Sequence, residues 1–239
     1  LSQLAAAGGI DLRAPDEIAE QLTPFLPDEV APGAGGQARL QRLVSQILET
    51  EGYFSPQIEF AGEDGDLRLT VAPGPRTVIA AVAVAVDGPV AAKTRQELIA
   101  GWELPVGQPF RQQEWNTAKQ QILSRLLAEN HAAARLVDSQ ATIDPATRQA
   151  RLMARYDSGP PFRFGELRVE GLERYPVTLV ERHNRTVRPG EPYREADLNA
   201  LQTALQATPQ FRSVQVSIDR AAPPDADGVV TAPVTVRLS

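Results

Sequence analysis

The sequence predicts an α+β protein built from three tandem units, each with the element order β-α-α-β-β. A pentapeptide that occurs twice indicates the repeat, because Gly190–Arg194 (GEPYR) matches Gly107–Arg111 (GQPFR) at an offset of 190 − 107 = 83. A second landmark lies at the same offset, since Val169–Gly171 matches Val86–Gly88 and 171 − 88 = 83. Two landmarks at one offset of domain size predict a repeated structural unit.

The pentapeptide has the composition of a turn that leads into a helix. In each copy glycine frees the backbone, proline fixes φ, and an aromatic side chain packs as the helix begins. The first unit, residues 1–75, comes before both copies. Its predicted elements are a strand over 9–13, a helix over 15–24, a Pro- and Gly-rich loop over 27–36, a helix carrying Leu40 to Leu48 and ended by Gly52, and strands over 57–60 and 67–71.

The second unit is expected over residues 76–160 and the third over residues 161–239. In the second unit the pattern predicts strands over 78–86, 134–143 and 150–156, a short helix opened by a capping box of Thr94 and Glu97, and a long helix from Trp115 to Leu127. In the third unit it predicts strands over 162–169, 214–218 and 234–238, a bulge at Gly165, and helices over 177–187 and from Leu198 to Leu205.

Three strands and two helices in each unit predict a two-layer sandwich, with both helices covering one face of a three-stranded mixed sheet. The last two strands form an antiparallel hairpin, and the simplest crossover pairs the first strand with the third in parallel. The second strand of each unit then lies at a free edge of its sheet.

The charge distribution argues against nucleic acid as a partner. The net charge is −6, and residues 1–75 carry 4 basic and 12 acidic side chains, residues 76–160 carry 10 and 8, and residues 161–239 carry 10 and 10. No unit has the basic excess that binding to phosphate backbones requires. The chain contains no cysteine, which excludes disulfides and thiolate chemistry. No apolar run approaches the length of a membrane span, and no signal peptide is evident.

No credible active site emerges, so the sequence predicts a protein that is not an enzyme and has no catalytic residues, cofactor or metal. His131 and His183 each lack a second histidine at the spacing of metal ligands. The acidic pairs lie in polar turns, where aspartate supports the backbone: Asp64 with Asp66, and Asp225 with Asp227.

The three units resemble POTRA domains, the periplasmic modules of the outer-membrane barrel assembly superfamily. The resemblance is carried by the β-α-α-β-β order, by Gly52-Tyr53-Phe54 after the second helix of the first unit, and by the Gly-x-Pro-aromatic motif of the other two units. Within that superfamily the chain is most similar to the TamA family, through residues 52–60 (GYFSPQIEF) and 156–165 (YDSGPPFRFG). The second unit departs from the pattern, because residues 129–132 read ENHA in place of Gly-Tyr-Phe.

The resemblance implies a non-enzymatic role in the periplasm of Gram-negative bacteria. TamA-like proteins continue into a C-terminal membrane β-barrel, which is absent from this chain and would attach these domains to the outer membrane. They work with the inner-membrane-anchored protein TamB in the insertion or secretion of outer-membrane proteins such as autotransporters. The expected partners are therefore a TamB-like protein, unfolded outer-membrane protein clients and the barrel itself.

The predicted binding mechanism is strand addition. An open sheet edge binds a partner strand through main-chain hydrogen bonds, largely independent of sequence. In the first unit this edge consists of Gln57, Ile58, Glu59 and Phe60. Two alternatives stay open: another POTRA-bearing protein, such as a BamA-like protein or a two-partner-secretion transporter, and an enzyme with an unrecognised site.

Overall fold

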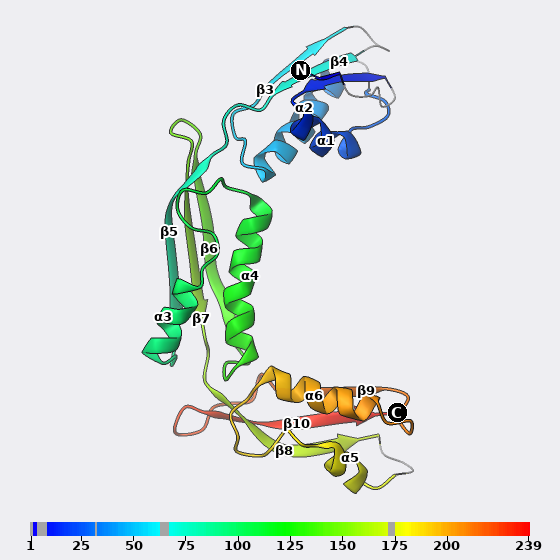
Figure 1. Cartoon of the computed structure of the whole chain (residues 1–239), viewed down its shortest axis with the longest axis vertical. Coiled ribbons are helices and arrows are strands. Elements are labelled where there is room, and N and C mark those ends of the chain that lie inside the picture. Colours follow the sequence, from blue (N-terminus) through cyan, green and yellow to red (C-terminus); the bar gives the residue numbers. More distant parts are fainter. Residues whose placement is uncertain (1, 4–8, 32, 63–66, 172–174) are drawn as a thin grey trace. The chain divides into compact units, whose positions relative to one another are not determined.

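The computed structural model describes residues 2–3, 9–31, 33–62, 67–171 and 175–239. Within these residues the chain forms six α-helices and three separate β-sheets, so the predicted α+β class is confirmed (Figure 1). The order β-α-α-β-β occurs three times in succession along the chain.

The first repeat contains a sheet with the strand order β1-β2-β4-β3. β2 pairs with β4 in parallel, and β3 pairs with β4 antiparallel, as the sequence predicts. The short strand β1 is an addition to the predicted three strands, and it pairs antiparallel with β2. The elements are β1 (Ser2–Gln3), β2 (Ile10–Ala14), α1 (Asp16–Leu22), a 3-10 turn (Thr23–Phe25), α2 (Ala34–Thr50), β3 (Gln57–Ala61) and β4 (Leu67–Ala72).

The core of the first repeat lies between this sheet and its helices. Leu69 and Val71 point inward from β4, because alternate side chains of a strand share one face. Leu40, Val44 and Leu48 form the buried stripe of α2 at helical spacing. Figure 1 shows α1 and α2 on the same side of the sheet, which is the predicted two-layer arrangement.

The N-terminal end of α2 differs from the sequence prediction, which placed a loop over residues 27–36. The helix begins at Ala34, so Gly35 and Gly36 belong to its first turn. Gly36 is buried, and a Cβ at this position would lie 1.8 Å from the carbonyl oxygen of Ala31. Glycine is needed here because two backbone segments approach closely, a constraint that the local composition does not reveal.

The second repeat has a sheet with the strand order β5-β7-β6. The predicted capping box is wrong, because α3 begins two residues before Thr94 and its N-cap, Ala91, makes no side-chain hydrogen bond. The elements are β5 (Val78–Asp87), α3 (Ala92–Ala100), α4 (Gln112–Ala128), β6 (Arg135–Asp144) and β7 (Gln149–Asp157).

The third repeat has the strand order β8-β10-β9, in which β8 and β10 are parallel and β9 and β10 antiparallel. The predicted bulge is confirmed, since the β8–β10 register shifts between Ala232 and Val234, opposite Gly165. The helix predicted over residues 177–187 is shorter than expected. The elements are β8 (Phe162–Glu170), α5 (Thr178–His183), α6 (Glu195–Gln206), β9 (Val214–Ile218) and β10 (Val230–Leu238).

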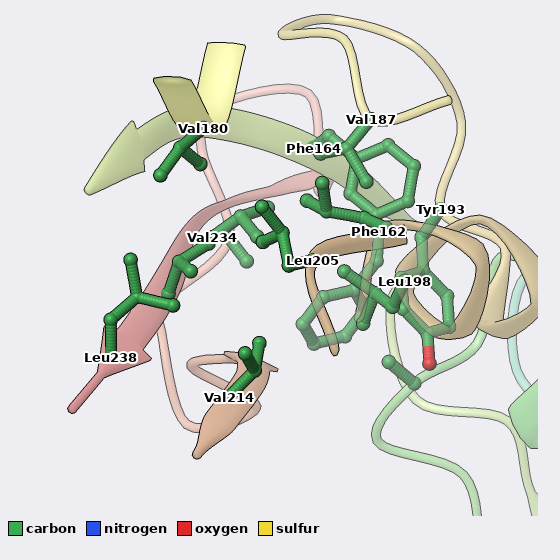
Figure 2. Close-up of a cluster of buried hydrophobic side chains, with 14 of the residues drawn as sticks. Phe162, Phe164, Val180, Val187, Tyr193, Leu198, Leu205, Val214, Val234 and Leu238 are labelled. Carbon is green, nitrogen blue, oxygen red and sulfur yellow. The ribbon is translucent and has the colours of Figure 1, made fainter. Parts of the chain in front are cut away.

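Aromatic residues concentrate at one end of the third core. The rings of Phe162 and Phe164 lie 6.5 Å and 5.7 Å from the ring of Tyr193, both edge-on. Figure 2 shows these three side chains close to Leu198 of α6. The aromatic residue of the repeated pentapeptide is therefore a core residue, as the sequence predicts.

By compactness the chain divides into two units, and the division falls within the middle repeat. One unit consists of residues 1–83, 103–118 and 140–153, and the other of residues 84–102, 119–139 and 154–239. Each unit contains one part of the middle repeat together with a whole neighbouring repeat. Gly52, Thr77 and Phe110, where the first repeat meets the second, lie in the first unit. Asn130, Phe162 and Tyr193, where the second meets the third, lie in the second unit.

Candidate functional site

The predicted docking strand lies at an edge of the first sheet. β3 is the last strand in the order β1-β2-β4-β3, and β4 is its neighbour. The register places Ile58 opposite Val71 and Phe60 opposite Leu69. One side of the β3 backbone therefore bonds to β4, and the other side faces away from the sheet.

The side chains of β3 hold the strand in place and leave its outer edge accessible. Ile58 and Phe60 are half-buried and pack against the core, whereas Gln57 and Glu59 are exposed. This alternation fixes the register, because a slip of one residue would expose both apolar side chains. The four residues predicted from the sequence thus lie together on one edge strand.

The opposite edge of the first sheet is partly covered. β1 pairs with β2 at Arg13 and Ala14, so this end of β2 already has a strand beside it. β3 consequently offers the longer run of unpaired backbone in this sheet, within the described residues.

The second strands of the other two repeats also lie at sheet edges, but their surroundings differ. In β9 the N–H of Val216 donates to Oε1 of Gln202 at 3.0 Å, so a side chain of α6 occupies one main-chain donor. β6 spans ten residues, and its Val137 side chain is 53% exposed. The prediction that the second strand lies at an edge is confirmed for all three sheets.

The repeated Gly-x-Pro-aromatic motif adopts the predicted turn in both copies. Gly107 and Gly190 have φ of 94° and 88°, a region that glycine enters without the steric cost that other residues pay. Phe110 and Tyr193 are both buried, and the helices begin two residues after them. The sequence did not predict that these loops also contact the preceding repeat.

The histidines have structural surroundings. His131 is buried, and this burial lowers its pKa from the usual 6.5, against the opposing effect of hydrogen bonds to the backbone of Gly159 and Pro160. His183 lies in α5, and its Nδ1 is 2.8 Å from the carbonyl oxygen of Leu179 one turn earlier. Neither environment contains a second imidazole.

The acidic pair at Asp225 and Asp227 supports a turn, as expected. Oδ1 of Asp225 accepts hydrogen bonds from the N–H groups of Asp227 and Val229, at 3.0 Å and 2.9 Å. Asp64 and Asp66 lie outside the described residues. In the part of the chain that the structure describes, no group of three or more His, Cys, Asp or Glu residues could hold a metal ion. Among the helices described there, none is both long and apolar enough to cross a membrane.

Comparison with known proteins gives the fold a name. No family model matches the sequence. The chain is similar to POTRA domains 3–5 of BamA from Haemophilus influenzae, with a TM-score of 0.56 and 15% identity over 98% of this chain and 96% of that chain. It is also similar to BamA from Haemophilus ducreyi lacking POTRA domains 1–3, with a TM-score of 0.55 and 17% identity over 68% of this chain. The match spans 29% of that second protein. These likenesses show that the chain has the POTRA fold in tandem copies.

Proposed function

We propose that this chain is the periplasmic, protein-docking region of a TamA-like outer-membrane translocation and assembly factor. The free edge of β3, in a protein with the POTRA fold, is the observation that carries the proposal. The sequence similarity of residues 52–60 and 156–165 to the TamA family supports this branch, as does the presence of three repeats. The proposed domains span residues 1–75, 76–160 and 161–239.

The proposed mechanism is addition of a partner strand beside β3. Ile58 and Phe60 point toward the core of the first repeat, so the partner meets the outer main chain and the exposed Gln57 and Glu59. Main-chain hydrogen bonds supply the affinity, and they depend little on the partner's side chains. Such an edge suits a protein that receives many different unfolded clients.

The proposed location is the periplasm, with attachment to the outer membrane through a C-terminal barrel. The proposed partners are a TamB-like inner-membrane-anchored protein and unfolded outer-membrane protein clients, for insertion or for secretion of proteins such as autotransporters. The docking role requires no chemistry from the chain, and the proposed protein is not an enzyme.

A second candidate is the POTRA region of a BamA-like protein. The observation that favours it is the likeness to three consecutive POTRA domains of BamA over 98% of this chain. Both candidates share strand addition at a sheet edge as their mechanism, and they differ in the partner. Binding of a TamB-like protein therefore distinguishes them.

The test uses two adjacent proline substitutions in β3, Ile58→Pro and Glu59→Pro. Main-chain N–H groups alternate in direction along a strand. The N–H of Leu67 bonds toward β2, so Thr70 bonds toward β3, and Glu59 lies opposite Thr70. Glu59→Pro therefore removes a donor to β4, and Ile58→Pro removes a donor on the outer edge. Ile58→Ala is measured beside them by thermal unfolding and by binding, because proline at position 58 also removes a side chain that packs against the core. The binding assay is a pull-down with the purified C-terminal part of a TamB-like protein, and the matched control is Val216→Pro in β9.

We expect Ile58→Pro to abolish binding, while Ile58→Ala, which loses the same half-buried side chain but keeps the N–H, binds normally. The β9 variant should bind normally. Full binding by the outer-edge variant would refute strand addition at β3. Failure of the unmodified chain to bind would instead refute the TamA-like assignment and favour the BamA-like alternative.

A further inference from the structure

The end of α2 in the first repeat bonds directly to the second repeat. The N–H of Thr77 donates to the carbonyl oxygen of Gly52 at 2.8 Å. On its other side Gly52 touches the Gly-x-Pro-aromatic loop, where a Cβ at Gly52 would lie 2.2 Å from the carbonyl oxygen of Phe110. The loop also bonds to Thr77, since the N–H of Phe110 donates to the carbonyl oxygen of Thr77 at 2.8 Å. These residues all belong to one compact unit.

The same arrangement occurs where the second repeat meets the third. The N–H of Phe162 donates to the carbonyl oxygen of Asn130 at 2.6 Å, and the N–H of Tyr193 donates to the carbonyl oxygen of Phe162 at 3.0 Å. Here the contact with the loop is a hydrogen bond, from the N–H of Asn130 to the carbonyl oxygen of Tyr193 at 2.9 Å. These residues also belong to one compact unit, the second.

The two junctions therefore use corresponding residues. Gly52 has φ of 90° and Asn130 has φ of 59°, so both take the left-handed backbone that exposes the end of a helix to a neighbour. Asparagine is the residue other than glycine that tolerates this conformation most readily. The departure of residues 129–132 from the Gly-Tyr-Phe pattern thus preserves the backbone shape.

Side chains reinforce both junctions. At the first, the Arg111 guanidinium lies 3.5 Å from a carboxylate oxygen of Glu51, and the rings of Phe54 and Phe110 are 5.9 Å apart. At the second, Ala132 of the second repeat is buried in the core of the third repeat. Apolar contact and ion pairing thus add to the main-chain bonds at the same place.

We infer that the Gly-x-Pro-aromatic loop is a receptor for the end of the second helix of the preceding repeat, and that this contact couples successive repeats. The loop has a structural role inside its own repeat, where it supplies a core aromatic residue. Its second role is contact with the preceding repeat. That role explains why a residue with left-handed backbone, Gly52 or Asn130, lies against the loop at both junctions. Coupling of this kind joins the docking edge of the first repeat to the second repeat.

The third repeat supplies an internal contrast. Gly52 lies five residues before the start of β3 (57 − 52 = 5), Asn130 five before β6 (135 − 130 = 5), and Pro209 five before β9 (214 − 209 = 5). Proline has no N–H and its ring holds φ near about −65°, so Pro209 can neither donate to a loop nor take the left-handed conformation. Pro209 therefore cannot make the contact with a Gly-x-Pro-aromatic loop that Gly52 and Asn130 make.

The test compares Gly52→Ala with Gly33→Ala in the whole chain. The two glycines flank α2 and have φ of 90° and 85°, so alanine is strained at both positions. A Cβ at Gly52 would strike the Phe110 carbonyl, whereas a Cβ at Gly33 would have no atom within 4 Å. A third variant, Thr77→Pro, removes the donor from the side of the second repeat.

Two measurements report the coupling. Hydrogen exchange follows the Thr77 amide, and electron spin resonance measures the distance between labels at Gln46→Cys and Thr142→Cys, which is clean because the chain has no cysteine. In Gly52→Ala we expect the Thr77 amide to exchange about tenfold faster and the distance distribution to broaden, with Gly33→Ala unchanged. Thr77→Pro should broaden the distribution in the same way.

The inference fails if Gly52→Ala and Gly33→Ala have the same distance distribution. If Gly52→Ala instead unfolds α2, seen as loss of protection at Val44 and Leu48, then Thr77→Pro decides. An unchanged distribution in Thr77→Pro would overturn the coupling of the two repeats through Gly52, and a broadened one would support it.

Discussion

Two adjacent glycines in the first turn of α2 should respond to alanine with opposite signs. Gly35 is exposed, and a Cβ there would have no atom within 4 Å, whereas Gly36 is buried against Ala31. Alanine loses less conformational freedom than glycine when a helix forms, so Gly35→Ala should stabilise the helix by about 0.5–1 kcal/mol. The same gain is present at Gly36, where steric conflict opposes it.

The size of that conflict follows from the structure. The new Cβ would lie 1.8 Å from the Ala31 carbonyl oxygen, whereas ordinary contacts begin at 3.4 Å, so the backbone must yield by 3.4 − 1.8 = 1.6 Å. Forcing extra atoms into a packed site costs about 1–3 kcal/mol. After subtraction of the helix gain, Gly36→Ala should lower the free energy of opening of α2 by up to about 2 kcal/mol.

Native-state hydrogen exchange at the amides of Leu40, Val44 and Leu48 measures this opening locally, which avoids the assumption that three repeats unfold together. We expect slower exchange in Gly35→Ala and faster exchange in Gly36→Ala. Equal stabilisation by both substitutions would show that the approach of Ala31 does not constrain the helix, and the argument would be wrong.

Two further predictions concern the second repeat. The Tyr156 hydroxyl donates to the carbonyl oxygen of Lys119 at 3.0 Å, and burial raises the pKa of this tyrosine to about 12. Tyr156→Phe should lower the free energy of unfolding by about 1 kcal/mol in urea titrations, while Tyr175→Phe, at an exposed position, should have no effect. Because burial lowers the pKa of His131, the folded chain favours the neutral imidazole, and its contribution to stability is complete above pH 6.5 and is lost as the pH falls. The free energy of unfolding, measured by urea titration, should fall between about pH 7.5 and about pH 5.5. The fall should be larger in the unmodified chain than in His131→Gln, by at most about 1.4 kcal/mol. An equal fall in both chains would contradict this reasoning.

The candidate docking edge was accessible to sequence reasoning because its signals are local. Alternation of Ile58 and Phe60 with Gln57 and Glu59 indicates a half-buried strand, and a hairpin to the next strand leaves it at the edge once the first strand pairs with the third. Whether a partner binds there stays a prediction. The additional strand β1 was not predicted, since Ser2 and Gln3 carry no pattern of their own.

Two predictions failed at the starts of helices. The capping box at Thr94 fits the local rule, but the helix begins earlier, at Ala92. The loop prediction over residues 27–36 relied on glycine content, and Gly36 is present because Ala31 lies against it. At Gly36 a contact made by the folded chain outweighs the short-range preference.

The sequence by itself determined the α+β class, the repeated β-α-α-β-β order and the edge position of the second strands, because periodicity and turn residues act between neighbours along the chain. Only the tertiary structure decided that the Gly-x-Pro-aromatic loops meet Gly52 and Asn130 of the preceding repeats. These contacts bring together main-chain atoms about sixty residues apart, by close approach of Gly52 and Phe110 and by a hydrogen bond between Asn130 and Tyr193 (110 − 52 = 58; 193 − 130 = 63). A main-chain hydrogen bond or close approach leaves no side-chain pattern, so its partner becomes known only when the fold brings the two segments together.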